Sequence, residues 1–147
     1  MSKVKIEILP LVGLPDLKFG DTTEQAEYIF GKPEETDELE DEDGPGTIVY
    51  SYWDIGINMF FRKAEKPYLV ALETDNLQTI LLEKKVFKLN EKALTELMFS
   101  QKQFDYESEM EEWGEKRFTW EAWNIDFYYE GKEIATINWS ADLDENE

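Results

Sequence analysis

Two segments of the chain alternate large apolar side chains with smaller or polar ones at a period of two. In residues 55–61, one face carries Ile55, Ile57, Met59 and Phe61, and the other carries Gly56, Asn58 and Phe60. In residues 123–129, one face carries Trp123, Ile125, Phe127 and Tyr129, and the other carries Asn124, Asp126 and Tyr128. This period indicates antiparallel strands that bury one face against a core and leave the other partly wet.

Two helices are expected, one before each alternating segment. The first covers about residues 22–30, because the run Asp21-Thr22-Thr23-Glu24-Gln25 offers an N-cap with an acid or amide three residues later, the capping-box pattern, and because Gly31 can end the helix. The second begins after Asn90 as its N-cap and ends near residues 99–104. Further strands are expected at residues 4–9, 68–73, 77–82 and 133–139, with a hairpin turn at 130–132.

The two halves of the chain resemble each other in pattern. Residues 50–61 match residues 118–129 in the order of aromatic, small and polar classes, although few residues are identical. We therefore predict a single α+β domain over residues 1–147, with internal repeats at about 17–83 and 86–140 and an acidic tail at 141–147. Each repeat is expected to be a helix plus a three- or four-stranded antiparallel meander, with the helices packed on one face of a shared antiparallel sheet.

The charge is strongly acidic and locally concentrated. The chain has 34 acidic and 15 basic residues, a formal net charge of −19. Acids crowd residues 34–43, 105–112 and 142–147, which we interpret as two exposed loops and a tail that either keep the protein in solution or dock a basic partner. Aligned as a calcium-binding loop on Gly44, the first segment has Leu39 and Tyr50 where carboxylates are required, so no metal is expected.

Composition excludes several kinds of chemistry. The chain contains no Cys and no His, which removes disulfides, thiolate nucleophiles, Ser–His dyads and His/Cys zinc sites. The acidic balance argues against nucleic acid, and no stretch approaches the roughly 18 apolar residues of a membrane span. No cofactor-binding loop is present, and the absence of a targeting pattern favours a cytoplasmic protein.

One opening motif resembles a known family. Residues 17–26 (LKFGDTTEQA) followed by residues 29–33 (IFGKP) resemble the opening of the β-lactamase-inhibitor-protein-like fold, which the SmpA/OmlA outer-membrane lipoproteins share. The resemblance implies a tandem helix-plus-sheet architecture. The second half departs from it, with Ser100-Gln101-Lys102 in place of Gly-x-Pro, and the disulfides of the inhibitors and the lipidated Cys of the lipoproteins are absent. No functional residue is carried over.

The residues out of phase with the core define a candidate binding face. We expect an apolar and aromatic patch rimmed by acids, formed by Trp53, Asn58, Phe60, Leu69, Asp126, Tyr128 and Ile134. The first acidic loop adds Glu38, Glu40, Asp41 and Glu42. The alternative is that a helix or the N-terminal segment covers this face.

These features favour a non-catalytic protein-binding domain. Its most concrete form is an immunity- or inhibitor-type protein that masks a basic partner, with charge steering the encounter. The alternatives are a small-molecule or peptide-binding module with a pocket between sheet and helices, and, least favoured, a hydrolase that uses carboxylates alone, such as Glu121 and Asp126.

Overall fold

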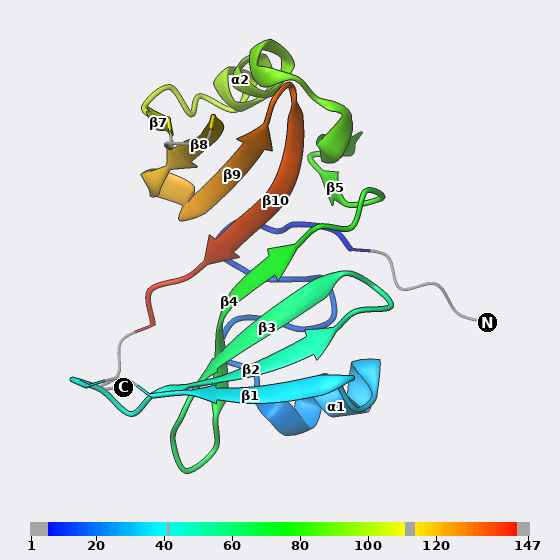
Figure 1. The fold of residues 1–147 in the computed structure, drawn as a ribbon, viewed down its shortest axis with the longest axis vertical. Coiled ribbons are helices and arrows are strands. Elements are labelled where there is room, and N and C mark those ends of the chain that lie inside the picture. The colour runs from blue at the N-terminus through cyan, green and yellow to red at the C-terminus, as the bar shows by residue number, and fades with distance from the viewer. Residues whose placement is uncertain (1–5, 41, 111–113, 144–147) are drawn as a thin grey trace.

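The computed structural model describes residues 6–40, 42–110 and 114–143. Its main element is one eight-stranded antiparallel sheet (Figure 1). In spatial order the strands are β1 (Glu35–Leu39), β2 (Thr47–Tyr52), β3 (Ile57–Arg62), β4 (Tyr68–Thr74), β10 (Glu133–Ser140), β9 (Ile125–Glu130), β8 (Glu115–Trp120) and β7 (Glu107–Met110). Strands β4 and β10 pair at the centre and join the first half of the chain to the second.

Both predicted helices are confirmed. Helix α1 (Thr23–Phe30) begins at a capping box in which Gln25 N donates to Thr22 Oγ1 and Thr22 N donates to Gln25 Oε1, and it ends at Gly31. Gly31 has a φ of 81°, which favours glycine. Helix α2 (Glu91–Ser100) begins with Ala93 N donating to Asn90 Oδ1 at 2.8 Å. In the described part of the chain, neither helix is long and apolar enough to cross a membrane.

The connection between the halves carries small elements of its own. These are a two-stranded sheet of β5 (Ile80–Leu81) and β6 (Lys84–Lys85), and the 3₁₀ turn η1 (Val86–Lys88). Another 3₁₀ turn, η2 (Glu121–Trp123), lies between β8 and β9. The strand predicted at 77–82 is thus reduced to two residues. The strand predicted at 4–9 is reduced to isolated bridges at Glu7 and Leu9, and residues 4 and 5 lie outside the described part.

The prediction of a tandem repeat of helix plus meander is wrong. The structure is a mostly-sheet α+β fold with one continuous eight-stranded sheet and two helices. Pairing of β4 with β10 merges all the main strands into a single sheet, and the separate β5–β6 sheet belongs only to the connection between the halves. Alternation at a period of two is a property of any half-buried strand, so similar patterns in two segments do not require a duplicated unit.

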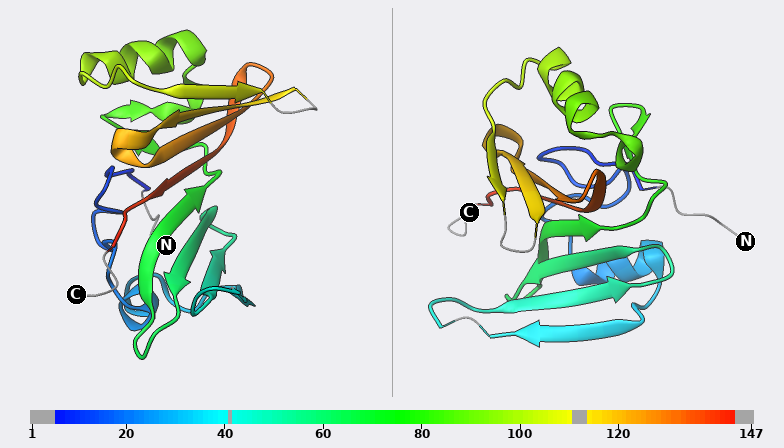
Figure 2. Two further views of the ribbon diagram at one scale, coloured as in Figure 1. Left: turned by 90° about the vertical axis from the view of Figure 1, so that its left-hand side faces the viewer. Right: turned by 45° about the horizontal axis from the view of Figure 1, so that its top comes forward.

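The core lies on one face of the sheet, which we call the core face. Helix α1, helix α2 and residues 6–20 all lie on this side (Figures 1 and 2). Buried aromatic side chains of the sheet donate hydrogen bonds to the backbone of the segments that cover the core face. Tyr52 Oη donates to Gly31 O at 2.8 Å, Tyr129 Oη donates to Leu89 O at 3.0 Å, and Trp139 Nε1 donates to Gly13 O at 3.1 Å.

The opposite face, which we call the outer face, is crossed by none of the described helices or loops (Figure 1). The sheet bends across β4 and β10, and both of its ends project toward the open side (Figure 2, left). No described helix or loop therefore covers the outer face, although Ser51 on β2 is buried within it.

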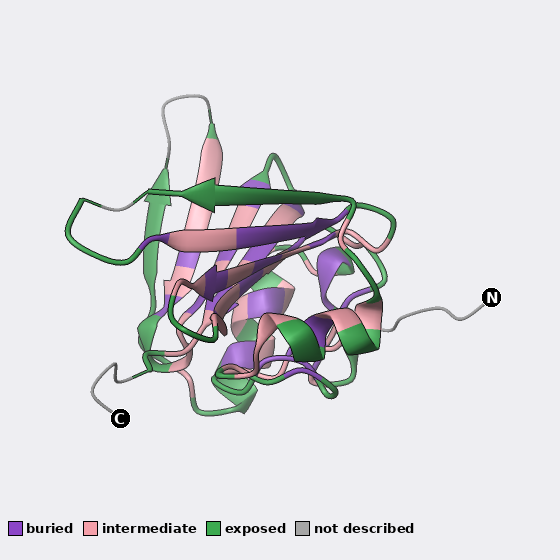
Figure 3. Ribbon diagram, turned by 90° about the horizontal axis from the view of Figure 1, so that it is seen from below, coloured by how far each residue is buried: buried purple, intermediate pink, exposed green. Residues whose placement is uncertain are grey.

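The acidic segments at residues 34–43 and 105–112 each contain a strand, and their prediction as loops is wrong. Glu35–Leu39 and Glu107–Met110 form β1 and β7, the two edges of the sheet, and every residue in them is exposed (Figure 3). Backbone pairing with β2 and β8 does not depend on side-chain charge, so acid-rich segments can join a sheet at its edge. Charged edges also prevent further strands from adding.

Candidate functional site

A row of polar side chains crosses the outer face on all eight strands. Each member lies directly opposite the next in the pairing register. This polar row consists of Glu35, Ser51, Asn58, Glu73, Asn138, Asp126, Thr119 and Glu107. At the usual strand spacing it is about 34 Å long. The row contains four carboxylates and no lysine or arginine.

The carboxylates near the centre of the polar row are held by their neighbours. Asn58 Nδ2 donates to Glu73 Oε1 at 3.1 Å across β3 and β4. Thr119 Oγ1 donates to Asp126 Oδ1 across β8 and β9. Each acid therefore has a fixed orientation at the surface, and an arriving cation meets it without a large loss of side-chain entropy.

Arg117 lies on the outer face, and nearby carboxylates compensate its positive charge. It forms an ion pair with Glu109 on β7 and lies opposite Tyr128 on β9. Partial burial opposes its charge, but the carboxylates of Glu109 and Asp126 outweigh that effect and raise the pKa of Arg117. Its Nε is buried without a hydrogen-bond partner among the described residues. Burial, followed by the nearby charge of Asp126, raises the pKa of Tyr128.

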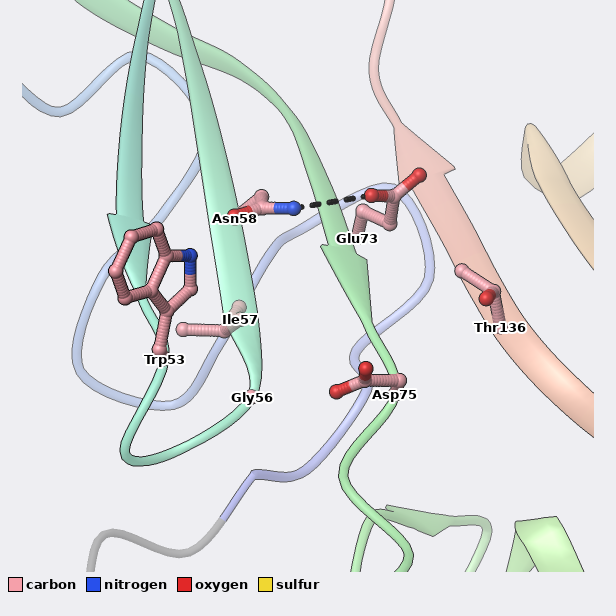
Figure 4. Close-up of a pocket in the computed structure, with 7 residues that line it drawn as sticks. All are labelled: Trp53, Gly56, Ile57, Asn58, Glu73, Asp75 and Thr136. Carbon is pink, nitrogen blue, oxygen red and sulfur yellow. Dashed lines mark hydrogen bonds between the residues drawn. The ribbon is translucent and has the colours of Figure 1, made fainter. Parts of the chain in front are cut away.

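A pocket opens beside the polar row where the β2–β3 turn meets the end of β4 and the middle of β10 (Figure 4). It has a volume of about 220 Å³ and is lined by Trp53, Gly56, Ile57, Asn58, Glu73, Asp75 and Thr136. The Trp53 side chain stands on the turn and is 63% exposed.

The β1 edge adds concentrated negative charge to the same face. By register, Glu35 and Asp37 both point to the outer face. A hydrogen bond that the protonated Glu35 carboxyl donates to Asp37, together with repulsion by the Asp37 charge, raises the pKa of Glu35. Two carboxylates held this close favour the approach of a cation.

Five of the predicted face residues do lie together on the outer face: Trp53, Asn58, Phe60, Asp126 and Tyr128. Leu69 and Ile134 do not, and their assignment is wrong, because they are 0% and 3% exposed and belong to the core. A β-bulge in each strand explains the error. The register shifts between Phe60 and Phe61 and between Ile134 and Thr136, so Val70 and Ala135 are extra residues that reverse the alternation.

Glu38, the predicted residue of the first acidic segment that lies in β1, does not join the outer face. Glu38 lies opposite Ile48 on the core side of β1 and forms an ion pair with Lys63, whose amine also lies 3.9 Å from Glu40. Glu42 is exposed in the turn after β1, and Asp41 lies outside the described residues. Glu38 and Glu40 therefore lie beside one lysine at the edge of the sheet rather than beside the pocket.

The sequence analysis missed several residues of the face. Glu73, Thr119 and Asn138 belong to the polar row, and extending the alternation into β4, β8 and β10 finds them. It also missed an aromatic cluster at the end of α2, where Phe99, Phe104 and Tyr106 are 40%, 61% and 40% exposed. The ring of Phe99 lies 5.6 Å from that of Phe104 and 6.2 Å from that of Tyr106.

A second, more open pocket lies on the helix side, with a volume of about 550 Å³. It is lined by Asp16, Glu24, Gln25, Tyr28 and Ile29. Within the described ranges, no group of three or more Asp or Glu side chains is arranged to hold a metal ion.

Comparison with protein-family models, curated proteins and solved structures found no match for this chain. The resemblance to the β-lactamase-inhibitor-protein-like fold therefore stays a prediction, and the function rests on the geometry of the chain itself.

Proposed function

We propose that this protein is a non-catalytic binding domain whose outer sheet face recognises a basic protein. The observation that carries the proposal is the polar row, which contains four carboxylates and no lysine or arginine and lies on a face that no described helix or loop covers. The most specific form of the proposal is an immunity- or inhibitor-type protein that masks its partner. The proposal includes a cytoplasmic location, which cell fractionation tests.

The dimensions of the face support a protein partner. A standard interface buries about 800 Å² on each side, which corresponds to a patch about 30 Å across. The polar row, at about 34 Å, has this length. Its acids lie at intervals along the face rather than around one point, which suits an extended basic surface.

The side chains beside the polar row support the same partner. Phe60, Tyr128 and the exposed Trp53 lie on the outer face beside the polar row. Aromatic residues contribute strongly to binding when a partner covers them, while surrounding charges steer the encounter and reject partners of the same sign. Nucleic acid and anionic membrane surfaces carry that same sign.

Two other functions have less support. The pocket beside Trp53, at about 220 Å³, is smaller than the roughly 300–1,000 Å³ typical of small-molecule sites. Carboxylate catalysis requires a cleft between two acids, whereas Glu73 and Asp126 are each tied to a neighbouring strand on an open face.

Affinity capture with matched variants tests the proposal. The wild-type chain is immobilised, and proteins retained from a lysate of the source cells are identified by mass spectrometry at low and high salt. The outer-face variant carries Trp53→Ala, Glu73→Gln and Asp126→Asn. The control carries Tyr28→Ala, Glu24→Gln and Glu96→Gln, which remove one aromatic ring and two charges from the helices.

We expect wild type and control to retain the same basic protein, with an isoelectric point above about 9, and the outer-face variant to lose it. Retention should weaken at high salt. Equal retention by the outer-face variant, loss in the control, or the absence of any basic partner would overturn the proposal.

A further inference from the structure

The pocket beside Trp53 has the chemistry of a receptor for a single cationic group. Trp53 forms one wall, and Glu73 and Asp75 lie along the opposite side (Figure 4). No lysine or arginine lines it. An indole face and carboxylates attract the same ligand, since the ring attracts cations through its quadrupole and the acids through their charge.

The two carboxylates have bonding capacity left. Glu73 Oε1 accepts from Asn58 Nδ2, and the other oxygen of Glu73 has no partner among the described residues. The Asp75 side chain likewise has no hydrogen-bonding partner in the described part of the chain, and it is exposed at the end of β4. A donor that enters the pocket can therefore reach both acids without displacing a protein contact.

Gly56 allows Asp75 to lie against the turn. It has a φ of +67°, and a Cβ at this position would lie 2.7 Å from Asp75 Oδ1. A side chain at residue 56 would therefore push the carboxylate out of position. The turn is also fixed from β4, because Thr74 Oγ1 donates to Gly56 O at 2.7 Å.

We propose that this pocket receives an arginine side chain of the basic partner. The guanidinium stacks on the indole of Trp53 and donates to the carboxylates of Glu73 and Asp75. Arginine fits better than lysine, because its planar fork can stack and bond to two acceptors at once. The volume of about 220 Å³ suits one long side chain rather than a whole ligand. This inference rests on the proposed function and names the residue type that anchors the partner.

Titration with short capped peptides tests the pocket directly. The probes are a tetra-arginine peptide, a tetra-lysine peptide and a tetra-citrulline peptide, the last of which keeps the shape of arginine without its charge. Binding is followed by ¹H–¹⁵N NMR of the full chain, with the indole signal of Trp53 identified by its loss in Trp53→Phe. Variants Glu73→Gln and Asp75→Asn are compared with Glu24→Gln, which removes the same charge from α1.

We expect tetra-arginine to shift the Trp53 indole signal and the backbone signals of residues 73–75, tetra-lysine to bind more weakly, and tetra-citrulline not to bind. Glu73→Gln and Asp75→Asn should each weaken tetra-arginine binding about tenfold, while Glu24→Gln leaves it unchanged.

Two outcomes would overturn the inference. Shifts confined to other residues of the polar row, such as Asp126, would reject the pocket and leave the proposed function standing. No shift anywhere on the outer face, with no basic protein captured, would reject both.

Discussion

Glu73 on β4 lies directly opposite Asn138 on β10, at the pairing that joins the two halves of the sheet. Asn138 is also opposite Asp126 on β9, so this amide separates two carboxylates in the centre of the polar row. The negative charge of the face is thus interrupted by a neutral side chain at the strand pairing that the whole sheet depends on.

Replacing that amide with an acid should weaken the fold. Asn138→Asp places a carboxylate directly between those of Glu73 and Asp126, and like charges directly opposite each other destabilise a sheet. We expect the free energy of unfolding in urea to fall by about 0.5–1 kcal/mol at low salt. The loss should shrink in 1 M NaCl, where charges are screened over about 3 Å. Asn138→Ser is the neutral control, and a loss that does not respond to salt would contradict this explanation.

The β-bulges in β4 and β10 determine which apolar residues of these strands are buried and therefore stabilise the fold. Leu69→Ala and Ile134→Ala each remove a fully buried side chain from the core and should reduce the free energy of unfolding by about 2–4 kcal/mol. Trp53→Ala removes a larger side chain that is 63% exposed. This variant should change the free energy of unfolding by less than about 0.5 kcal/mol. Urea unfolding curves of the three variants measure this. If Trp53→Ala were the most destabilising, the assignment of faces would be inverted.

The sequence predicted both helices and the buried face of the two alternating strands correctly, because capping residues and strict alternation are local signals. It failed at Leu69 and Ile134, because a bulge reverses the phase of a strand. The signal is present in the spacing: Leu69 and Leu72, like Ile134 and Ile137, are three residues apart and share the core. That spacing is incompatible with an uninterrupted period of two.

The acidic segments were predicted as loops for a different reason. Residues 35–39 and 107–110 have low strand propensity and bury nothing, so composition indicates loops. Their place as edge strands depends on backbone pairing with β2 and β8, which composition does not reveal. For the same reason the polar row was only partly predicted, since its members at Glu35 and Glu107 lie on these edges.

The acidic edge strand should protect the protein against self-association. Glu35→Thr and Asp37→Thr together remove both outer-face charges of β1 and supply a residue with higher strand propensity. We expect this double variant to form dimers or larger species at high protein concentration in sedimentation velocity. Glu24→Gln with Glu96→Gln removes the same net charge from the helices and should remain in the same state as wild type. Equal association of both variants would attribute the effect to net charge alone.

Alkaline pH should destabilise the protein through its buried tyrosines. Burial, together with the acceptor Glu27, raises the pKa of Tyr50 to about 12, and burial also raises the pKa of Tyr129. In the unfolded chain these groups lose their protons near pH 10. Stability is therefore complete below about pH 10 and falls as pH rises toward 12, because only the unfolded state releases protons easily.

Urea unfolding at pH 8, 10 and 11 measures this fall. Tyr50→Phe should make it less steep, whereas Tyr28→Phe, at a side chain that is 91% exposed on α1, should leave it unchanged. An identical slope in Tyr50→Phe and wild type would show that this phenol is not responsible.

The most direct measurement of the central claim is zero-length cross-linking of the captured complex. A carbodiimide joins carboxylates to lysine amines only where they touch, and mass spectrometry identifies the joined residues. We predict cross-links from the partner's lysines to Glu35, Glu73, Glu107 and Asp126, the four acids of the polar row. Cross-links concentrated instead on Asp16, Glu24 and Glu96, on the side of the molecule that carries the helices, would contradict the account.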